Sequence, residues 1–297
     1  MRISDAINGY LIFKSQTAAP STLKTDRVHL DQFAAWLGRD EEAHTLTTER
    51  ITEYLLYQRN RGLSPFTIRR HRAVLSHMFS WLSAPHNGIV AENIVKHTTP
   101  PKLPRRKVQV LTEDEVGQLI DSAHETQTPK RDEAIVRFMI DSCCRATEVC
   151  TVSRSDLDLK TGRAFVTGKG SKERFVWIGN RALHSAWLYL NTERPQHQQR
   201  DADMLFLTHD GCPMNRNTLR LLYNRLGRKA GVPRVHPHLM RHTGALWRLL
   251  AGMNLEMLRQ FLGHESIKTT QVYLSGLSDK DMAQASARTS PGDNLRL

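Results

Sequence analysis

The amino-acid sequence predicts a mainly α-helical protein in two parts. The first part is all-helical, and the second adds a small antiparallel β-sheet to its helices. Three observations lead to this fold class. Apolar residues recur at helical spacing through the first 99 residues. A proline-rich basic segment then interrupts the pattern. Beyond it, helical segments flank short strand-like runs. A chain of 297 residues is long enough for two domains.

Residues 1–99 are predicted to form a helical domain. In its last helical segment, one stripe collects the apolar side chains of Ile68, Val74, Leu75, Met78, Phe79 and Leu82. Ser64 followed by Pro65 is typical of an N-cap and a first turn. The side chains of Arg69, Arg70 and Arg72 can face outward, where they would suit a phosphate backbone. A merely solvated face is the alternative. The other helical segments cover residues 3–13, 21–37 and 47–60.

Residues 100–110 are predicted to be a linker. Prolines at 100, 101 and 104 stiffen the chain and prevent a regular helix. The linker is strongly basic and is a candidate contact for nucleic acid through Lys102, Arg105, Arg106 and Lys107. A new helix should begin after Thr112, which forms a capping-box pattern with Glu115. We therefore assign residues 111–277 to a second domain and residues 278–297 to a C-terminal tail.

The second domain mixes helices with a sheet. Residues 130–144 have a helical pattern, and helices return from about Ala182. Between them, the turn "GKGSKE" separates two strand-like runs at 164–167 and 175–178, and an earlier run lies at 157–159. These runs predict a small antiparallel sheet of three strands.

Composition narrows the class of partner and the compartment. The net charge of +12 favours a polyanion such as nucleic acid, although a merely basic protein is the alternative. Asp5 and Asn8 interrupt any secretory signal, and no run approaches the roughly 20 apolar residues of a membrane span. The cysteines lack zinc-ligand spacing and suggest no disulfide framework, which favours the cytoplasm: they are Cys143, Cys144, Cys150 and Cys212.

Six polar side chains of the second domain form the candidate catalytic set: Arg145, Lys169, His238, Arg241, His264 and Tyr273. Taken singly, each has an ordinary structural explanation. Together they suit phosphoryl transfer without a metal ion. Two guanidiniums can hold the nonbridging oxygens of a phosphodiester, while an acid protonates the departing alkoxide. A tyrosine, with an ordinary pKa of about 10, needs a nearby cation or base to attack. The resulting phosphoester conserves the bond energy, so the strand can be resealed without ATP.

Sequence spacing supports the convergence of these groups. His238 and Arg241 are three residues apart, so they share one face of a helix that Pro237 can begin. Gly263 has the position of a helix C-cap after residues 256–262. We therefore expect His264 in a tight corner, with Tyr273 one short helix farther along.

In order and separation these residues resemble the tyrosine site-specific recombinases, also called the phage integrase family. The stretches "GKGSKER", "LGH" and "TTQVY" are similar to family members, and Glu148 fits the acidic position three residues after Arg145. The resemblance covers about Leu111 to Leu277, and the helical first domain resembles the family's core-binding domain. One departure lies before Arg145, where the family often has Thr-Gly and this chain has Ser142 and Cys143. Glycine there would ease a tight approach of the backbone.

The resemblance implies a reaction and a role for each residue. Tyr273 would attack the scissile phosphate and form a 3′-phosphotyrosyl link, which frees a 5′-hydroxyl. Arg145 and Arg241 would clamp the phosphate, and Lys169 would protonate the leaving 5′-oxygen. No metal or cofactor is implied.

The same resemblance assigns the remaining residues and the assembly. His238 would act as acid–base group toward the tyrosine, His264 would hydrogen-bond the phosphate, and Glu148 would brace the site. Strand exchange would pass through a Holliday junction in a tetramer, homomeric or with a paralogue, that clamps two DNA duplexes. The tail at 278–297 could dock on a neighbouring subunit. The chain leaves little room for an arm-binding domain, which favours short core sites of the Xer type. Integration, dimer resolution and transposition by a mobile element remain open.

Three alternative functions compete with this interpretation. A metal enzyme could use the cluster of His236, His238 and His242, but Leu239 occupies the position where a metalloprotease motif requires glutamate. A DNA-binding regulator would explain the charge and the helices, but not Tyr273 with its cationic partners. A type IB topoisomerase would use similar chemistry, and the "LGH" and "TTQVY" stretches favour the recombinases over it.

Overall fold

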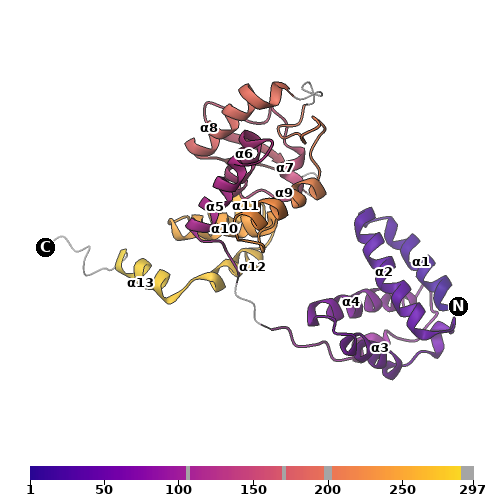
Figure 1. Cartoon of the computed structure of the whole chain (residues 1–297). Coiled ribbons are helices and arrows are strands. Elements are labelled where there is room, and N and C mark those ends of the chain that lie inside the picture. Colours follow the sequence, from indigo (N-terminus) through magenta and orange to yellow (C-terminus); the bar gives the residue numbers. More distant parts are fainter. Residues whose placement is uncertain (105–107, 169–171, 197–202, 289–297) are drawn as a thin grey trace. The chain divides into compact units, whose positions relative to one another are not determined.

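The computed structural model describes residues 1–104, 108–168, 172–196 and 203–288. The chain divides into two compact units, Met1–Arg105 and Arg106–Leu297 (Figure 1). The boundary falls inside the proline-rich segment. Each unit has its own apolar core.

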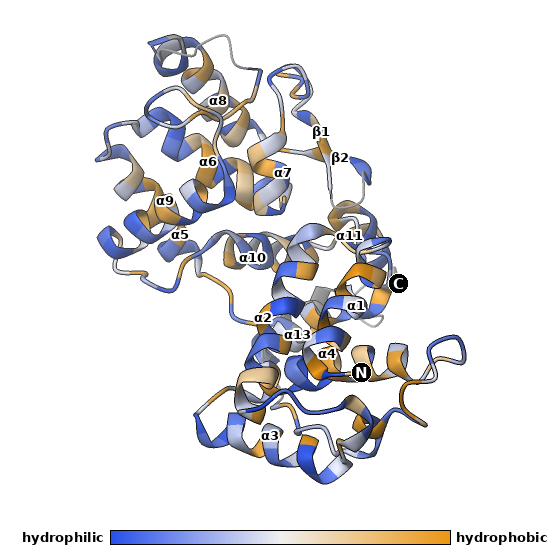
Figure 2. Ribbon diagram, turned by 90° about the vertical axis from the view of Figure 1, so that its right-hand side faces the viewer, coloured by the Kyte–Doolittle hydropathy of each residue, from blue (hydrophilic) through white to orange (hydrophobic). Residues whose placement is uncertain are grey.

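The described residues of the first unit form helices and no strand longer than an isolated bridge. The four helical segments expected from the sequence are all confirmed: α1 (Ile3–Ser15), α2 (Pro20–Leu37), α3 (Thr48–Asn60) and α4 (Pro65–Leu82). Two 3-10 helices complete it, η1 (Ala43–Thr45) and η2 (Ile94–His97). Figure 2 shows that α3 and α4 each carry both hydrophobic and hydrophilic residues. Their hydrophobic faces close the core of this unit.

Helix α4 begins and packs as its sequence predicts. The hydroxyl of Ser64 accepts the backbone N–H of Thr67 at 3.2 Å, and Pro65 occupies the first turn. The whole predicted apolar stripe is buried. Arg72, expected to face outward, instead donates to the carbonyl oxygens of Val95 and Thr98 at 3.0 and 2.9 Å. Its guanidinium therefore holds η2 against α4.

Among its described residues, the second unit combines helices with one small sheet, labelled β1 and β2 in Figure 2. Helix α6 is its centre and packs against α5, α8 and α10. The capping box at the start of α5 is confirmed, because Thr112 and Glu115 exchange bonds at 2.9 and 3.2 Å. The helices are α5 (Glu113–His124), α6 (Pro129–Ser142), α7 (Ala146–Thr151), α8 (Asn180–Leu188), α9 (Arg216–Lys229), α10 (Pro237–Leu250), α11 (Leu255–Leu262), α12 (Ile267–Thr270) and α13 (Asp279–Arg288), with the π-helix η3 (Tyr189–Glu193) and the 3-10 helices η4 (Arg194–Gln196) and η5 (Gln271–Gly276).

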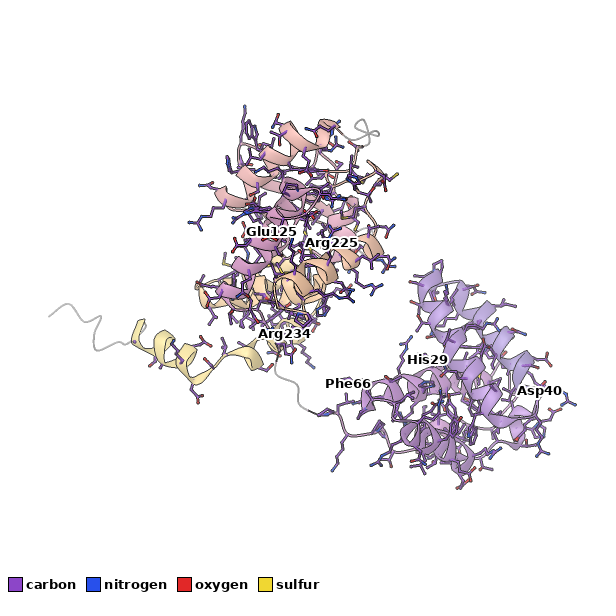
Figure 3. The ribbon with its side chains drawn as sticks, viewed as in Figure 1. His29, Asp40, Phe66, Glu125, Arg225 and Arg234 are labelled. Carbon is purple, nitrogen blue, oxygen red and sulfur yellow. The ribbon has the colours of Figure 1, made fainter. Side chains whose placement is uncertain are left out.

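An ion pair ties the start of α10 to α5. Arg234, labelled in Figure 3, lies just before α10 and donates to both carboxylate oxygens of Glu115 at 2.5 and 2.7 Å. The same Glu115 closes the capping box of α5. The entry to α10 is thereby fixed against the first turn of α5.

The sheet has two strands among the described residues, and the expected third strand is wrong. Strands β1 (Arg163–Thr167) and β2 (Glu173–Trp177) pair antiparallel, with Phe165 opposite Phe175. The run at 157–159 contributes only an isolated bridge. The reason is local: the carboxylate of Asp158 accepts the backbone N–H of Lys160 at 2.8 Å. This bond turns the chain before a strand can extend.

None of the described helices is long and apolar enough to cross a membrane.

Candidate active site

Helix α10 carries two of the predicted residues on one face. Pro237 occupies its first turn, as expected, and places His238 at the surface and Arg241 in the interior. The side chain of Arg241 is only 2% exposed. Its guanidinium donates to the carbonyl oxygens of Cys143 at 2.6 Å and Leu262 at 2.8 Å. Arg241 therefore joins the end of α6 to the end of α11.

The backbone at Cys143 makes the first of these bonds possible. Among the described residues, Cys143 is the one non-glycine with a positive φ, at 50°. This left-handed conformation ends α6 and is one that glycine adopts without strain. It explains why glycine would suit this position. Helix α10 approaches closely here, because a Cβ on Gly244 would lie 2.1 Å from the carbonyl oxygen of Ile140.

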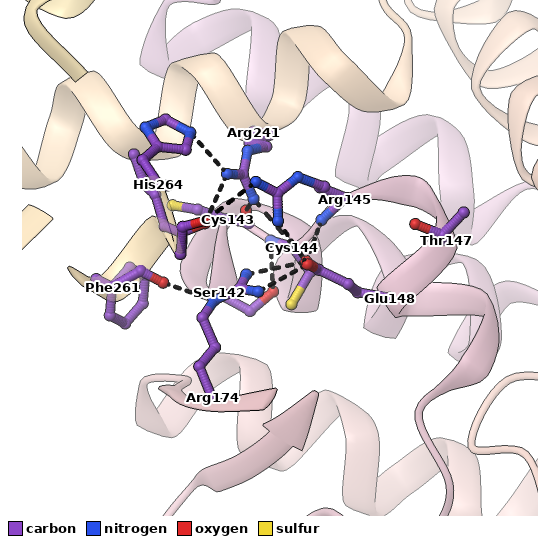
Figure 4. A network of polar contacts seen from close by, with 12 residues as sticks. Ser142, Cys143, Cys144, Arg145, Thr147, Glu148, Arg174, Arg241, Phe261 and His264 are labelled. Carbon is purple, nitrogen blue, oxygen red and sulfur yellow. Dashed lines mark hydrogen bonds and ion pairs between the residues drawn. The ribbon is translucent and has the colours of Figure 1, made fainter. Parts of the chain in front are cut away.

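A buried carboxylate collects the arginines of the site (Figure 4). Glu148, on α7, is fully buried. It accepts from Arg145 at 2.9 Å and from both terminal nitrogens of Arg174 at 2.7 and 2.9 Å. A third guanidinium, that of Arg241, lies 3.9 Å away. The single carboxylate of Glu148 thus lies among three guanidiniums, and the cluster keeps a net positive charge.

The pKa of Glu148 reflects this arrangement. Burial alone would raise the pKa of its carboxyl group. The hydrogen bonds and charge of Arg174, joined by the backbone and charge of Arg145, outweigh burial and lower the pKa to about 2. Glu148 is therefore ionised at neutral pH.

The corner at Gly263 positions His264, as expected from the sequence. Gly263 ends α11 in the left-handed conformation, with φ 64°. His264 Nε2 lies 3.1 Å from Arg241, and Nδ1 lies 3.0 Å from the hydroxyl of Thr270. Because a guanidinium only donates, Nε2 accepts and Nδ1 carries the proton. Burial, with the charges of Arg241 and Arg145, lowers the pKa of His264 to about 4. His264 is therefore neutral and links Arg241 to α12.

Tyr273 lies inside the same unit as the arginines. It belongs to η5, one short helix after His264 as predicted, and it is only 1% exposed. Its hydroxyl lies 3.1 Å from Nδ1 of His242. Burial raises the pKa of the Tyr273 phenol, and the charges of Arg241 and Arg145 oppose that rise. The phenol is therefore within the electrostatic reach of both arginines.

The exposed His238 is separated from Tyr273 by the ring of His242. Its ring meets that of His242 edge to face, with centroids 4.2 Å apart. The ring of His242 in turn meets that of Tyr273 at 5.4 Å. The pKa of His238 is lowered by partial burial and then by the charge of Arg241. The hydrogen bond to the phenol is made by His242.

A cavity of about 940 Å³ opens over the arginine cluster. Its cationic lining consists of Arg145, Lys172, Arg174 and Arg259. His264 also lines it, and so do the carboxylates of Glu173 and Glu265, of which Glu265 is paired with Lys172. The excess of cations suits an anion such as a phosphodiester.

Lys169, Arg105, Arg106 and Lys107 fall outside the described residues. Arg69, Arg70 and Lys102 are exposed. Arg70 also pairs with the buried carboxylate of Asp26 at 2.5 Å.

Two residues of the cluster were not predicted, although each had a signal in the sequence. Arg174 stands in the "GKGSKER" stretch and shares the inward face of β2 with Val176. An arginine at such a position needs a buried acid. His242 is four residues after His238 on α10, so the two rings share a helix face. The sequence associated it only with a metal cluster, yet no three His, Cys, Asp or Glu side chains of the described residues are arranged to hold a metal ion.

Comparison with known proteins decides the family. The sequence profile described as the phage integrase family matches residues 109–278, more than half of the chain. The chain belongs to the phage integrase family. It is a tyrosine recombinase, an enzyme that breaks and joins DNA strands. Tyrosine recombinase XerC of Chromohalobacter salexigens is 30% identical over 97% of this chain and 99% of its own length. XerC of Roseiflexus sp. is 28% identical over 91% and 89%.

Solved structures agree with the fold of this recombinase. The Tn1549 transposon integrase in complex with transposon right end DNA superposes with a TM-score of 0.80 at 16% identity, covering 98% of this chain and 100% of that one. A lambda integrase dimer bound to a core site gives 0.76 at 17% identity, covering 94% and 97%. XerA recombinase gives 0.56 at 24% identity, covering 97% and 99%.

Proposed function

We propose that this recombinase acts at specific DNA sites and cuts each strand through a 3′-phosphotyrosyl intermediate on Tyr273, without metal or ATP. The observation that carries the proposal is the burial of the Tyr273 phenol in its own unit, where Arg241 and Arg145 both act on its pKa. A phenol held near two fixed guanidiniums is suited to attack a phosphodiester that those guanidiniums bind.

The cationic cavity supplies the phosphate site in this proposal. Arg145 is partly exposed toward it, while Arg241 is fixed by two backbone carbonyls. Together they clamp the nonbridging oxygens, and preorganised cations of this kind need no rearrangement as charge develops. Lys169 is assigned to protonate the leaving 5′-oxygen. His264 holds Arg241 in place, and its Nε2 can donate to the phosphate only after that nitrogen has released the arginine and gained a proton.

The acid–base group for the phenol belongs to α10 in this proposal. His238 and His242 lie edge to face there, and His242 reaches the hydroxyl of Tyr273. Glu148 braces the arginines. The freed 5′-hydroxyl of a partner strand then attacks the phosphotyrosine, which exchanges strands through a Holliday junction.

DNA is the proposed partner, and the assembly is a tetramer on two duplexes. Structural neighbours were solved with DNA, and the net charge of +12 suits such a polyanion. We assign residues 1–99 to core-site binding, residues 100–110 to the linker and residues 111–277 to catalysis. Residues 278–297, which begin with α13, are assigned to contact with a neighbouring subunit. We also assign the protein to the cytoplasm, where a DNA substrate would be available to it.

A nicked suicide substrate tests the function. Duplexes drawn from DNA flanking the gene are nicked so that cleavage releases a short fragment and traps the covalent complex. Wild type should form a protein–DNA adduct that resists denaturation and survives EDTA. Tyr273→Phe should bind the duplex and form none. The matched control is Tyr223→Phe, which removes a buried hydroxyl that has no hydrogen-bond partner among the described residues and should keep activity.

The outcomes separate the alternatives. Adduct formation by Tyr273→Phe would overturn the assignment of the nucleophile. Loss of activity on chelation, restored by magnesium, would favour a metal-dependent nuclease. Robust relaxation of supercoiled DNA that lacks any specific site would favour a type IB topoisomerase.

A further inference from the structure

We propose that His242 accepts the proton of the Tyr273 hydroxyl during attack and returns it during resealing. This inference rests on the proposed function. It starts from one contact, the 3.1 Å separation between Nδ1 of His242 and the hydroxyl oxygen of Tyr273. A proton acceptor must stand within hydrogen-bond reach of the proton it takes, and His242 meets that condition.

The other groups near the phenol are unsuited to this role. Arg241 carries only donors. Both ring nitrogens of His264 are engaged, one with Arg241 and one with Thr270. The thiol of Cys143 is fully buried, and burial raises its pKa to about 11. That leaves the two imidazoles of α10 that meet edge to face, of which His242 is the one bonded to the phenol.

The protonation state of His242 fits an acceptor. Burial lowers its pKa to about 4, with help from His238, Arg241, His236 and His264. The ring is therefore neutral at pH 7, and its Nδ1 lone pair can face the phenol while Nε2 carries the hydrogen. So weak a base cannot ionise a buried phenol in advance. The transfer must accompany bond formation to phosphorus, and the negative charge of an entering phosphate makes the imidazole more basic.

The step balances in atoms and charge. The Tyr273 O–H bond breaks as the bond from its oxygen to phosphorus forms, and the proton moves to Nδ1 of His242. The bond from phosphorus to the 5′-oxygen breaks, and that oxygen takes a different proton from the general acid, assigned to Lys169. Resealing runs the same transfers in reverse. His242 thus takes the role that resemblance alone gave to His238.

Replacement of His242 by asparagine separates proton transfer from hydrogen bonding. In His242→Asn the side-chain oxygen can stand near the original Nδ1 position and accept the phenol hydrogen bond, but it cannot take the proton. His242→Ala removes both functions. The matched control His184→Asn changes an exposed histidine on α8, a helix that carries none of the site residues. Rates of covalent adduct formation are measured in single turnovers at saturating suicide substrate, from pH 6 to 9, on variants whose circular dichroism matches wild type.

The expected result is a slow reaction in both variants. General acid–base catalysis typically contributes about 10²- to 10⁴-fold, so His242→Asn and His242→Ala should each be at least ~100-fold slower at pH 7. The rate of His242→Asn should rise with pH toward the ionisation of the phenol, more steeply than wild type. His184→Asn should react like wild type. With a sulfur in place of the leaving 5′-oxygen, which needs no acid, the defect of His242→Asn should persist.

Three results would overturn the inference. His242→Asn could react at the wild-type rate, which would reduce His242 to a positioning residue. Both variants could be slow with a pH profile parallel to that of wild type. The 5′-sulfur substrate could restore the rate of His242→Asn, which would place His242 on the leaving-group side. Failure of the proposed function is distinguishable, because wild type itself would then form no adduct.

Discussion

Glu148→Gln removes the one negative charge around which the arginines of the site gather. The substitution keeps the shape of the side chain but leaves the guanidinium of Arg174, 11% exposed, without its counterion. A carboxyl pKa lowered from 4.5 to about 2 corresponds to about 3 kcal/mol of stability at neutral pH. We therefore expect the free energy of unfolding to fall by about 3 kcal/mol, within the range for breaking a buried ion pair.

The pH dependence of this effect has a definite sign. The folded-state pKa of Glu148 lies below its unfolded value, so its contribution is complete above about pH 4.5. It is lost as pH falls toward 2 and the carboxylate takes up its proton. The difference in stability between wild type and Glu148→Gln should therefore be constant from pH 5 to 8 and shrink below pH 4.5.

Urea unfolding followed by circular dichroism, with one transition fitted for each unit, measures both effects. Glu256→Gln is the matched control. Its carboxylate also accepts from an arginine, Arg259, but the pair is solvent-exposed. That variant should unfold almost like wild type, because exposed pairs are screened. A stability for Glu148→Gln within ~0.5 kcal/mol of wild type, or a difference that does not change at low pH, would refute the reasoning.

Two further predictions concern the two units separately. Gly244→Ala should strongly destabilise the second unit in thermal unfolding, because the new methyl would lie 2.1 Å from the carbonyl oxygen of Ile140. The control is Gly117→Ala, whose new methyl would have no atom within 4 Å. It should stabilise the same unit by up to about 1 kcal/mol. A tolerated Gly244→Ala would contradict the close packing of α6 and α10. Arg72→Ala should lower the melting temperature of the first unit, because η2 loses the hydrogen bonds that Arg72 donates to it. Arg69→Ala should leave that temperature unchanged. It should instead weaken DNA binding and reduce the salt dependence of that binding. Equal melting temperatures for the two variants would contradict the role given to Arg72.

Much of the fold could be predicted because its signals are local. Ser64, Thr112 and Gly263 each act on the backbone within a few residues, so their caps could be recognised in the sequence. The prediction of a third strand was wrong because of an interaction that is also local in sequence. The carboxylate of Asp158 accepts a hydrogen bond from a neighbouring backbone N–H and turns the chain. The apolar residues on either side of Asp158 had suggested a strand instead.

Arg145, Arg241, His264 and Tyr273 were predicted to belong to one unit and lie in it, but their contacts could not be predicted. Arg174 meets Glu148 across 26 positions, and His242 meets Tyr273 across 31. Such partners depend on how α7, β2, α10 and η5 pack, which periodicity does not specify. The same holds for His264, whose ring nitrogens join Arg241 and Thr270. The tertiary structure therefore supplies the hydrogen-bond partner of the phenol and the second arginine of Glu148.

The covalent bond to Tyr273 is the central claim, and peptide mapping tests it most directly. The adduct trapped on a suicide substrate is digested with nuclease and protease, and the modified peptide is sequenced by mass spectrometry. The account predicts a nucleotide joined through its 3′-phosphate to Tyr273. A nucleotide found on any other residue, or no modified peptide from a substrate that has been cleaved, would contradict it.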